Sequence, residues 1–287
     1  MSKYIVTADI HLRNDKPVAR IDEDWMQSQK EILDFIVQTA NEKEAHIVIG
    51  GDLFNTSIVP VRIVNLFLSS IRECKYKVYI MGGNHSLLHH QEGLIDDSSV
   101  GVLRYVDGNI IYLTSEEART DGRYEHIAEI NDEIAIVHTL CFKTEEDIPF
   151  GSNATHAQAL LDKYPKYRYL FLGDNHTSFI YDNRVFNPGC PIVQNAGMID
   201  YVPSVYFVDT EEEVYEKVYT PDHTENLTSV HIEINNARKA RLDDFITAIK
   251  KDKKLTLSFE DNLKANMVKA PIGVQDMISQ IFEEAIG

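Results

Sequence analysis

The amino-acid sequence predicts a mixed α/β fold, and three observations support that prediction. Short β-branched apolar runs alternate with segments of helical periodicity between residues 4 and 85. The middle third contains short apolar runs without long helical segments between them, which indicates a second sheet. At 287 residues, the chain is long enough for one large domain with a smaller one attached.

The amino-terminal third is predicted to form a βαβαβ unit. We expect strands over residues 4–8, 47–49 and 77–81, with helices over residues 24–43 and 60–72 between them. Leu33, Ile36 and Ala40 recur at helical spacing in the first helix. Pro60 suits the first turn of the second helix, because its missing N–H needs no partner there. Such a unit favours a largely parallel sheet.

The middle of the chain is expected to add mostly strands. These lie over residues 109–113, 124–130, 133–137, 169–172, 178–181, 184–186, 205–208 and 214–218, with one short helix over residues 154–163. Asp182 and Asn183 form a turn dipeptide whose residues tolerate positive φ. Residues 178–186 are therefore predicted to form a hairpin.

A polar connector at residues 220–224 is the best candidate for a domain boundary. We therefore divide the chain into a domain of residues 1–222 and a small cap of residues 223–287. Within the cap, strands over residues 229–234 and 255–259 and helices over residues 238–250 and 274–285 predict an α/β unit.

Composition and charge narrow the functional classes. A hydrophobic content of 44% and a charged content of 25% are ordinary for a soluble globular protein. The net charge of −17 argues against a protein that coats nucleic acid, because such affinity comes from Lys and Arg contacts to phosphates. It does not exclude an enzyme that acts on nucleic acid.

Localisation and redox state are also constrained. No apolar run reaches the ~18 to 20 residues that span a bilayer, and no secretory leader is visible, so we expect a cytosolic protein without a membrane partner. Cys74, Cys141 and Cys190 lie far apart in the sequence. This spacing indicates neither a disulfide framework nor a zinc knuckle.

Polar residues with metal-binding side chains follow five of the predicted strands. Asp52, for example, comes directly after an apolar run and two glycines that let the backbone turn sharply. The carboxyl ends of strands are where ligands bind in open α/β sheets. The residues at these strand ends are Asp9, His11, Asp52, Asn84, His85, His138, Asp174 and His176. One histidine at a strand end would mean little, but the joint pattern predicts a metal site.

The donor atoms indicate which metals and which chemistry. Carboxylate and carboxamide oxygens mixed with imidazole nitrogens suit Mn²⁺, Fe²⁺ or Zn²⁺ better than Ca²⁺, which prefers oxygen alone. A carboxylate shared by two such ions holds them ~3.5 to 4 Å apart, and the pair can clamp both oxygens of an in-line displacement at phosphorus. A nearby imidazole can protonate the leaving oxygen. The pattern therefore predicts metal-dependent hydrolysis of a phosphoester.

These residues resemble the motifs of the calcineurin-like metallophosphoesterases, in order, over about residues 3–210. The family motifs are Asp-x-His, Gly-Asp, Gly-Asn-His-Asp/Glu, a lone His and Gly-His-x-His. They are matched by Asp9-Ile10-His11, Gly51-Asp52, Gly83-Asn84-His85, His138 and Gly173-Asp174-Asn175-His176. The resemblance implies two mixed β-sheets packed as a sandwich with flanking helices.

The resemblance also implies a role for each matched residue. Asp9, His11 and His176 would hold one metal, Asp52 would bridge, Asn84 and His138 would hold the second metal, and His85 would be the acid beside the scissile phosphate. Two positions depart from the family pattern. Asp174 replaces a histidine, which exchanges a neutral ligand for an anion at the second metal and favours Mn²⁺ or Mg²⁺. Ser86 replaces a carboxylate that would favour the imidazolium form of His85.

Within the superfamily, the chain looks most like the SbcD-type nuclease subunits and their phage recombination relatives. The likeness lies in residues 7–12 and 51–56 and in the Asn-Pro-Gly-Cys-Pro turn at residues 187–191. It implies Mn²⁺-dependent hydrolysis of DNA phosphodiester bonds, in recombination or repair. It also implies a partner like SbcC, a coiled-coil ATPase, and a two-fold homodimer. The chain is short for that group and shows no obvious extra carboxy-terminal helices for docking the ATPase.

Two other functions fit the same motifs. A phosphomonoesterase or a cyclic-nucleotide phosphodiesterase would use the same metal ligands, and the acidic surface favours a small substrate. A catalytically weakened regulatory or binding subunit would explain the altered motifs. Bound metal distinguishes this last reading, because a scaffold without activity has no need of two ions.

Several further residues are weaker candidates for substrate contacts. They are His89 and His90 after the third motif, Arg13, Lys16 and Arg20 after the first, and Tyr164, Tyr167 and Tyr169 beside Lys166 and Arg168. The basic residues could grip a phosphate backbone, and the tyrosines could stack on bases. Exposure of loop histidines, solubility and a sheet edge explain the same residues without a substrate.

Overall fold

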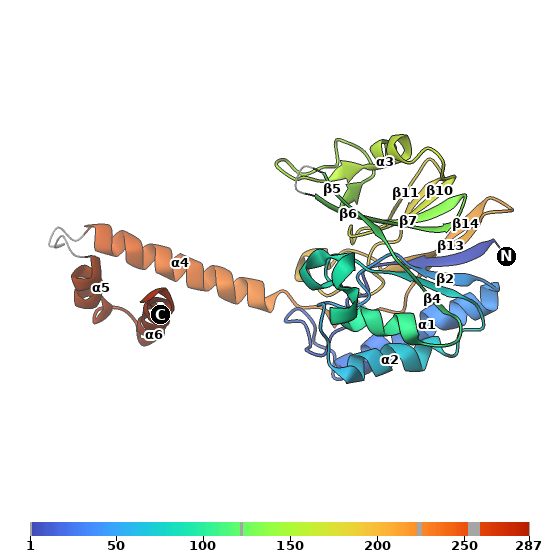
Figure 1. Cartoon of the computed structure of the whole chain (residues 1–287). Coiled ribbons are helices and arrows are strands. Elements are labelled where there is room, and N and C mark those ends of the chain that lie inside the picture. The colour runs from blue at the N-terminus through green and yellow to red at the C-terminus, as the bar shows by residue number, and fades with distance from the viewer. Residues whose placement is uncertain (1, 121–122, 223–225, 252–258, 287) are drawn as a thin grey trace. The chain divides into compact units, whose positions relative to one another are not determined.

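The structure is a computed structural model that describes residues 2–120, 123–222, 226–251 and 259–286. The chain divides into two compact units, Met1–Leu227 and Thr228–Gly287. The boundary predicted from the sequence lies after residue 222, shortly before this division. Figure 1 shows two layers of strands with flanking helices in the first unit and helices in the described part of the second.

The first unit contains a six-stranded mixed sheet. Across the sheet, its strands are β14 (Val214–Tyr219), β13 (Ser204–Asp209), β1 (Lys3–Thr7), β2 (His46–Ile49), β3 (Val78–Met81) and β4 (Ile110–Leu113). Strands β1 to β4 run parallel to one another, whereas β13 and β14 are antiparallel to their neighbours. The parallel part confirms the predicted βαβαβ unit, because helices connect β1 to β2 and β2 to β3.

A second six-stranded mixed sheet packs face to face with the first (Figure 1). Its strands are, in order, β11 (Phe179–Tyr181), β12 (Val185–Asn187), β10 (Tyr169–Gly173), β7 (Ile134–His138), β6 (Arg123–Asn131) and β5 (Glu116–Thr120). β10 is parallel to β7 and β12, and the outer pairs are antiparallel. The predicted hairpin is confirmed, with Asp182 and Asn183 at φ values of 50° and 51°. A two-stranded ribbon, β8 (Cys141–Phe142) with β9 (Thr155–His156), completes the strands.

Alternate residues of the first sheet face two different cores. Ile5 and Ile47 belong to the cluster under the outer helices, whereas Val6 and Val48 belong to the cluster between the sheets. The two-residue period of a strand sends neighbouring side chains to opposite faces. Because both faces are covered, the central residues of these strands are apolar on both sides, which is why the sequence shows short continuous runs.

The helices of the first unit begin and end where local chemistry predicts. In α1 (Trp25–Lys43), the Asp24 carboxylate accepts a hydrogen bond from the Gln27 N–H at 3.1 Å, and Glu44 ends the helix with a φ of 54°. Pro60 precedes α2 (Val61–Ile71). The helix α3 (Ala157–Lys163) covers the outer face of the second sheet. Four 3₁₀ segments are η1 (Leu88–His90), η2 (Glu92–Asp97), η3 (Ser99–Tyr105) and η4 (Ala196–Met198).

The second unit is helical wherever it is described, and this corrects the prediction of a small α/β cap. Its helices are α4 (Val230–Lys251), α5 (Phe259–Met267) and α6 (Ile272–Ile286). The predicted strand over residues 229–234 was wrong. Apolar residues alternate there, but helix-forming residues follow without a break, and a growing helix adds one hydrogen bond per residue. Most of the strand predicted over residues 255–259 lies outside the described residues.

A small apolar cluster holds the last two helices together. Ala270, Val274 and Ile278 are buried, with Leu263 and Met267 packed against them. Among the residues that the structure describes, no helix combines the length and apolarity needed to cross a membrane.

Candidate metal centre

The strand topology brings the predicted ligands to one edge of the first unit. Asp9 and His11 follow β1, Asp52 follows β2, His138 ends β7, and Asp174 and His176 follow β10. β1 and β2 belong to one sheet and β7 and β10 to the other, so both sheets contribute side chains. The Asp9 N–H donates to the carbonyl oxygen of Gly51 at 3.2 Å, which joins the first two loops.

The backbone at this edge adopts an uncommon conformation. Asp9, His11, Asp52 and Asp174 have φ values of 52°, 50°, 46° and 87°. Non-glycine residues adopt the left-handed region at a cost, and such residues concentrate at functional sites. Gly51, at a φ of 106°, is needed for a second reason: a Cβ there would collide with the His138 ring. The strand ends therefore turn sharply and point their side chains toward a common point.

Asp9, His11 and His176 form one group of facing donor atoms, all within 4.8 Å of one another. The Nε2 atoms of His11 and His176 lie 3.2 Å apart. The buried Nδ1 of His11 has no hydrogen-bond partner among the described residues. Two imidazole nitrogens facing each other beside a carboxylate are an arrangement that a cation would stabilise.

Asp9, Asp52 and His138 form the second group. The Nδ1–H of His138 donates to the Gly50 carbonyl oxygen at 2.9 Å, which leaves the lone pair of a neutral ring on Nε2. That Nε2 faces two oxygen acceptors, Asn84 Oδ1 at 2.9 Å and Asp52 Oδ2 at 3.4 Å. Asp52 Oδ2 is buried and has no hydrogen-bond partner among the described residues. A proton or a metal ion must therefore occupy this point.

Two carboxylates are placed to connect the groups. Asp9 belongs to both. Asp52 Oδ2 lies 4.0 Å from the Nε2 of His11 in the first group and 3.4 Å from the Nε2 of His138 in the second. The other oxygen of Asp52 accepts from the N–H groups of His85 at 2.9 Å and Ser86 at 3.3 Å. One side of Asp52 is thus tied to the protein and the other is available.

Burial and neighbouring charges raise the pKa values of Asp9 and His138 and lower those of His11 and Asp52. Burial raises the pKa of Asp9 well above its ordinary value. Burial also lowers the pKa of His11 to about 3. For His138, burial works against the charged form, but the carboxylate of Asp52 outweighs it, helped by Asp174 and Asp9, and the pKa rises to about 10. The pKa of Asp52 is lowered, because His138 outweighs the effect of burial.

These observations fit a divalent metal site. Carboxylate oxygens, imidazole nitrogens and a carboxamide oxygen are suitable donors, and Asp52 Oδ2 is buried without a hydrogen bond. Divalent ions favour ionised carboxylates and neutral imidazoles, so they would relieve the opposed pKa shifts. The residues present therefore suit the metal pair predicted from the sequence.

Asp174 and His85 lie at the centre without joining either three-residue group. The Asp174 N–H donates to both carboxylate oxygens of Asp9, at 3.1 and 3.0 Å, so its backbone orients a predicted ligand. Burial raises the pKa of the Asp174 side chain. The ring of His85 is exposed, and its centroid lies 5.1 Å from that of His11. Ser86 hydrogen-bonds through its hydroxyl to the backbone of Phe54 at 3.2 Å.

A cavity of about 180 Å³ opens beside the ligands. Its polar and charged lining comprises Asp9, His11, Arg13, Asn55, His85, His176, Gln194 and Asn195. Sequence reasoning missed Asn55, Gln194 and Asn195, because such residues are common in loops. The nearby turn at residues 187–191 was the one signal that pointed to this part of the chain.

Most of the weaker candidates have structural partners. Arg20 is buried and bonded to Asp22 and Asp222, and Lys16 Nζ donates to the Asp22 carbonyl oxygen at 2.9 Å. The hydroxyls of Tyr164 and Tyr167 donate to Glu125 and Glu129. Tyr169 is buried. These contacts explain the positions of these residues without a substrate.

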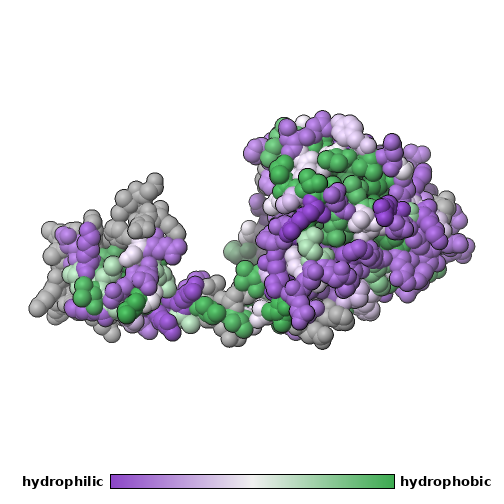
Figure 2. Space-filling view, turned by 90° about the horizontal axis from the view of Figure 1, so that it is seen from below, coloured by the Kyte–Doolittle hydropathy of each residue, from purple (hydrophilic) through white to green (hydrophobic). Residues whose placement is uncertain are grey.

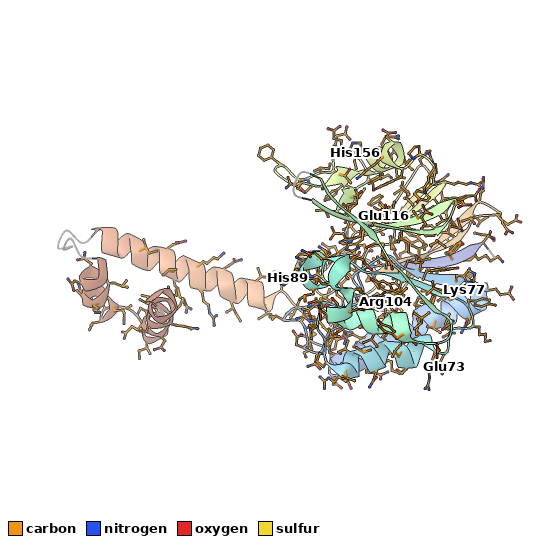
Figure 3. All side chains as sticks on the ribbon, in the orientation of Figure 1. Glu73, Lys77, His89, Arg104, Glu116 and His156 are labelled. Carbon is orange, nitrogen blue, oxygen red and sulfur yellow. The ribbon has the colours of Figure 1, made fainter. Side chains whose placement is uncertain are left out.

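The two loop histidines differ from each other. His90 Nδ1 contacts the carbonyl oxygen of Asn84, a predicted ligand, so His90 supports the centre. His89 is exposed, and Figure 3 shows it at the margin of the first unit.

Comparison with known proteins identifies the family. The model of the calcineurin-like phosphoesterases matches residues 2–178, more than half of the chain, so the chain belongs to this family. None of the curated proteins matches the chain. A crystal structure of a dimetal phosphatase from Danio rerio is 12% identical, with a TM-score of 0.30. That alignment covers 53% of this chain and 48% of the other, so it spans about half of each protein.

Proposed function

We propose that this calcineurin-like phosphoesterase is a dimetal phosphodiesterase that hydrolyses DNA, as the SbcD-type nucleases do. The metal-dependent hydrolysis in this proposal rests on the position of His138. Its Nε2 faces Asn84 Oδ1 at 2.9 Å and Asp52 Oδ2, which accepts no hydrogen bond, at 3.4 Å. Acceptors this close face either a proton on Nε2 or a bound cation, and a divalent ion would use the same donor atoms. Family membership and the second histidine-rich group support a pair of ions.

In this proposal, each ligand keeps the role implied by the motifs. Asp9, His11 and His176 hold the first ion, Asp52 is shared, and Asn84, His138 and Asp174 hold the second. Bound divalent ions supply Lewis acidity, both to the attacking water and to the phosphoryl group. The oxygen-rich second site, with the carboxylate of Asp174 close by, favours Mn²⁺ among the candidate metals.

His85 is the proposed acid. Its ring lines the cavity and is exposed, while its N–H is bound to Asp52 Oδ1 at 2.9 Å. The backbone contact fixes the ring beside the centre, and exposure leaves the ring able to reach a substrate. His85 would donate a proton to the leaving oxygen, a contribution of about 10²–10⁴-fold in rate.

DNA is proposed as the substrate because of three sequence segments and one side chain. Residues 7–12, 51–56 and 187–191 carry the likeness to the SbcD type. Arg13 lines the cavity, where its guanidinium is bonded to the exposed Asp15. A phosphate of the backbone could replace Asp15, because exposed ion pairs are weak. The small cavity and the net charge of −17 instead favour the alternative, a phosphomonoesterase or cyclic-nucleotide phosphodiesterase.

Two protein partners are proposed. In the second unit, Val268 in the turn after α5 and Ile272 at the start of α6 are exposed by 81% and 77% and offer apolar side chains to an SbcC-like coiled-coil ATPase. The sequence predicted two helices in this unit and no obvious extra ones for such docking, whereas the described residues form α4, α5 and α6. Figure 2 shows hydrophobic areas on one face of the first unit. Val61 and Tyr105, each exposed by 73%, are apolar side chains that a second copy of the chain could cover.

One experiment tests the substrate. Purified protein loaded with Mn²⁺ is assayed on single- and double-stranded DNA and on chromogenic phosphomonoesters and phosphodiesters, with Asp52→Asn as the matched control. We expect DNA and diester cleavage that the control lacks. Hydrolysis of monoesters or cyclic nucleotides alone would favour the alternative enzymes. Absence of both hydrolysis and bound metal would favour a weakened binding subunit.

A further inference from the structure

The turn at residues 187–191 has no role in the chemistry proposed above, yet it touches the loop that carries His176. Asn187 ends β12, and its side chain is fully buried. Its Nδ2 donates to the carbonyl oxygen of Asn175 at 2.7 Å and to that of Thr177 at 2.8 Å. These two residues flank His176. One carboxamide therefore holds the backbone on both sides of a proposed metal ligand.

The rest of the turn grips the same loop. The Cys190 N–H donates to the carbonyl oxygen of His176 at 3.0 Å. Gly189 has a φ of +71°, and a Cβ there would lie 2.6 Å from the His176 carbonyl oxygen and 2.8 Å from the Ser178 nitrogen. Glycine is thus needed both for its backbone conformation and for the close approach. Asn187 and Cys190 thus both hydrogen-bond to the backbone of residues 175–177.

His176 depends on such support because of where it lies in the chain. It falls between the end of β10 at Gly173 and the start of β11 at Phe179, beyond both strands. Its Nε2 must nevertheless meet the Nε2 of His11 at 3.2 Å, in the group that includes Asp9. A second carboxamide, that of Asn175, donates to the Cys141 carbonyl oxygen at 2.8 Å and fixes the loop to the ribbon of β8.

We propose that Asn187 is a positioning residue for His176, acting through the backbone of residues 175–177 and without touching metal or substrate. The inference rests on the proposed metal centre and goes beyond it, because it assigns a function to a turn outside the matched motifs. Groups that orient metal ligands usually change metal affinity by about 10–100-fold when they are removed. Loss of both donated hydrogen bonds would free the loop and separate His176 from His11.

The test compares two asparagines with the same local chemistry. Asn109 Nδ2 also donates to two backbone carbonyl oxygens, those of Cys74 at 2.7 Å and Tyr76 at 2.8 Å. It precedes β4, at the opposite end of the parallel strands from the metal ligands. Asn187→Asp and Asn109→Asp each replace a donating amide by a carboxylate, so both variants lose a pair of hydrogen bonds to the backbone. Asn187 is fully buried and Asn109 half-buried, so the fold of each variant is checked separately.

Mn²⁺ binding to the full chain is measured by titration calorimetry, with circular dichroism to confirm folding. We expect Asn187→Asp to weaken one Mn²⁺ site about 10–100-fold, while Asn109→Asp keeps both sites at wild-type affinity. Wild-type affinity in folded Asn187→Asp would overturn the inference. If that variant does not fold, the same titration is made with Asn187→Ala, which adds no charge and leaves room for water. A wild-type chain that binds no Mn²⁺ would instead refute the proposed function itself.

Discussion

Two clusters of buried charged side chains in the first unit differ in whether all of their carboxylate oxygens accept hydrogen bonds. In one, Arg20 donates to both oxygens of Asp22 at 2.7 and 2.6 Å and to Asp222 at 2.8 Å. The second oxygen of Asp222 accepts from the Val193 N–H at 2.7 Å. In the other, the metal centre, Asp52 Oδ2 is buried without a hydrogen bond. Both clusters bury ionised groups, but the Arg20 cluster is complete without a cofactor.

The difference separates a structural role from a functional one. A buried carboxylate costs several kcal/mol unless it is paired. Arg20 meets that requirement and joins the loop of residues 13–22 to Val193 and Asp222, segments far apart in the sequence. In the candidate metal centre, Asp52 is paired with the imidazole of His138 at 3.4 Å, and a divalent ion would replace the proton between them. Four variants test this difference.

Asp52→Asn should have the largest effect. The carboxamide keeps an oxygen for the His85 and Ser86 N–H groups but removes the charge shared by the two groups of ligands. We expect loss of at least one bound metal and a fall in hydrolysis of at least about 10³-fold, with the fold retained. Metal analysis and steady-state kinetics check this, and full activity would contradict the role of Asp52.

Arg20→Met should have the reverse outcome. It leaves Asp22 and Asp222 buried without their partner, so the free energy of unfolding should fall by about 3–5 kcal/mol. Chemical denaturation measures this, and Mn²⁺ binding by the folded fraction should not change. Arg72→Met is the matched control, because the Arg72–Glu73 pair is exposed and such pairs contribute about 0–1 kcal/mol. Equal losses in both variants would refute the structural role of the Arg20 cluster.

His85→Asn tests whether the exposed imidazole beside the candidate metal centre is the acid. The ring is exposed and stands outside both groups of ligands, so metal content should remain near that of the wild type. The turnover number should fall by about 10²–10⁴-fold if the imidazole is the acid. Loss of both ions in this variant would show that His85 is a ligand instead.

Asp22→Asn should remove a part of the stability that depends on pH, so the loss is present at neutral pH and disappears in acid. Burial acts to raise the pKa of Asp22, but the bonded Arg20 and Ser28 outweigh it and lower that pKa. The unfolded chain then binds more protons near its pKa of about 3.9, so this carboxylate stabilises the fold above that pH and stops doing so as the pH falls through the lower folded value. The free energy of unfolding, measured between pH 5 and 2, should therefore change less with pH in the variant than in the wild type. An equal pH dependence in the two proteins would contradict the lowered pKa of Asp22.

Much of the fold was predictable because its signals are local. β-branched runs fully buried on both faces gave the parallel strands, and Asp182-Asn183 gave the hairpin between β11 and β12. The second unit was misjudged because alternation at Val230, Ile232 and Ile234 has the period of a strand. That short pattern competes with a helix of 22 residues, and cooperative helix growth prevails.

The residues available to the candidate metal centre could be identified from the amino-acid sequence alone. Asp9, Asp52 and His138 each follow an apolar run, and the parallel arrangement of the strands sends such residues to one edge. That inference needs only the order of strands and turns. It also named His11 and His176, which the structure places with their Nε2 atoms 3.2 Å apart.

Which buried charged groups already have partners depends on the tertiary structure. Arg20 and Arg13 look alike in the sequence, yet Arg20 is buried between Asp22 and Asp222, whereas Arg13 lines the cavity. Asp222 lies some two hundred positions from Arg20, and Asn187 reaches back to the loop of His176. Hydrogen bonds between distant segments depend on how the two sheets pack, so no local pattern can reveal them. That Asp52 Oδ2 accepts no hydrogen bond is known only from the three-dimensional structure, in which the described donors around it are placed.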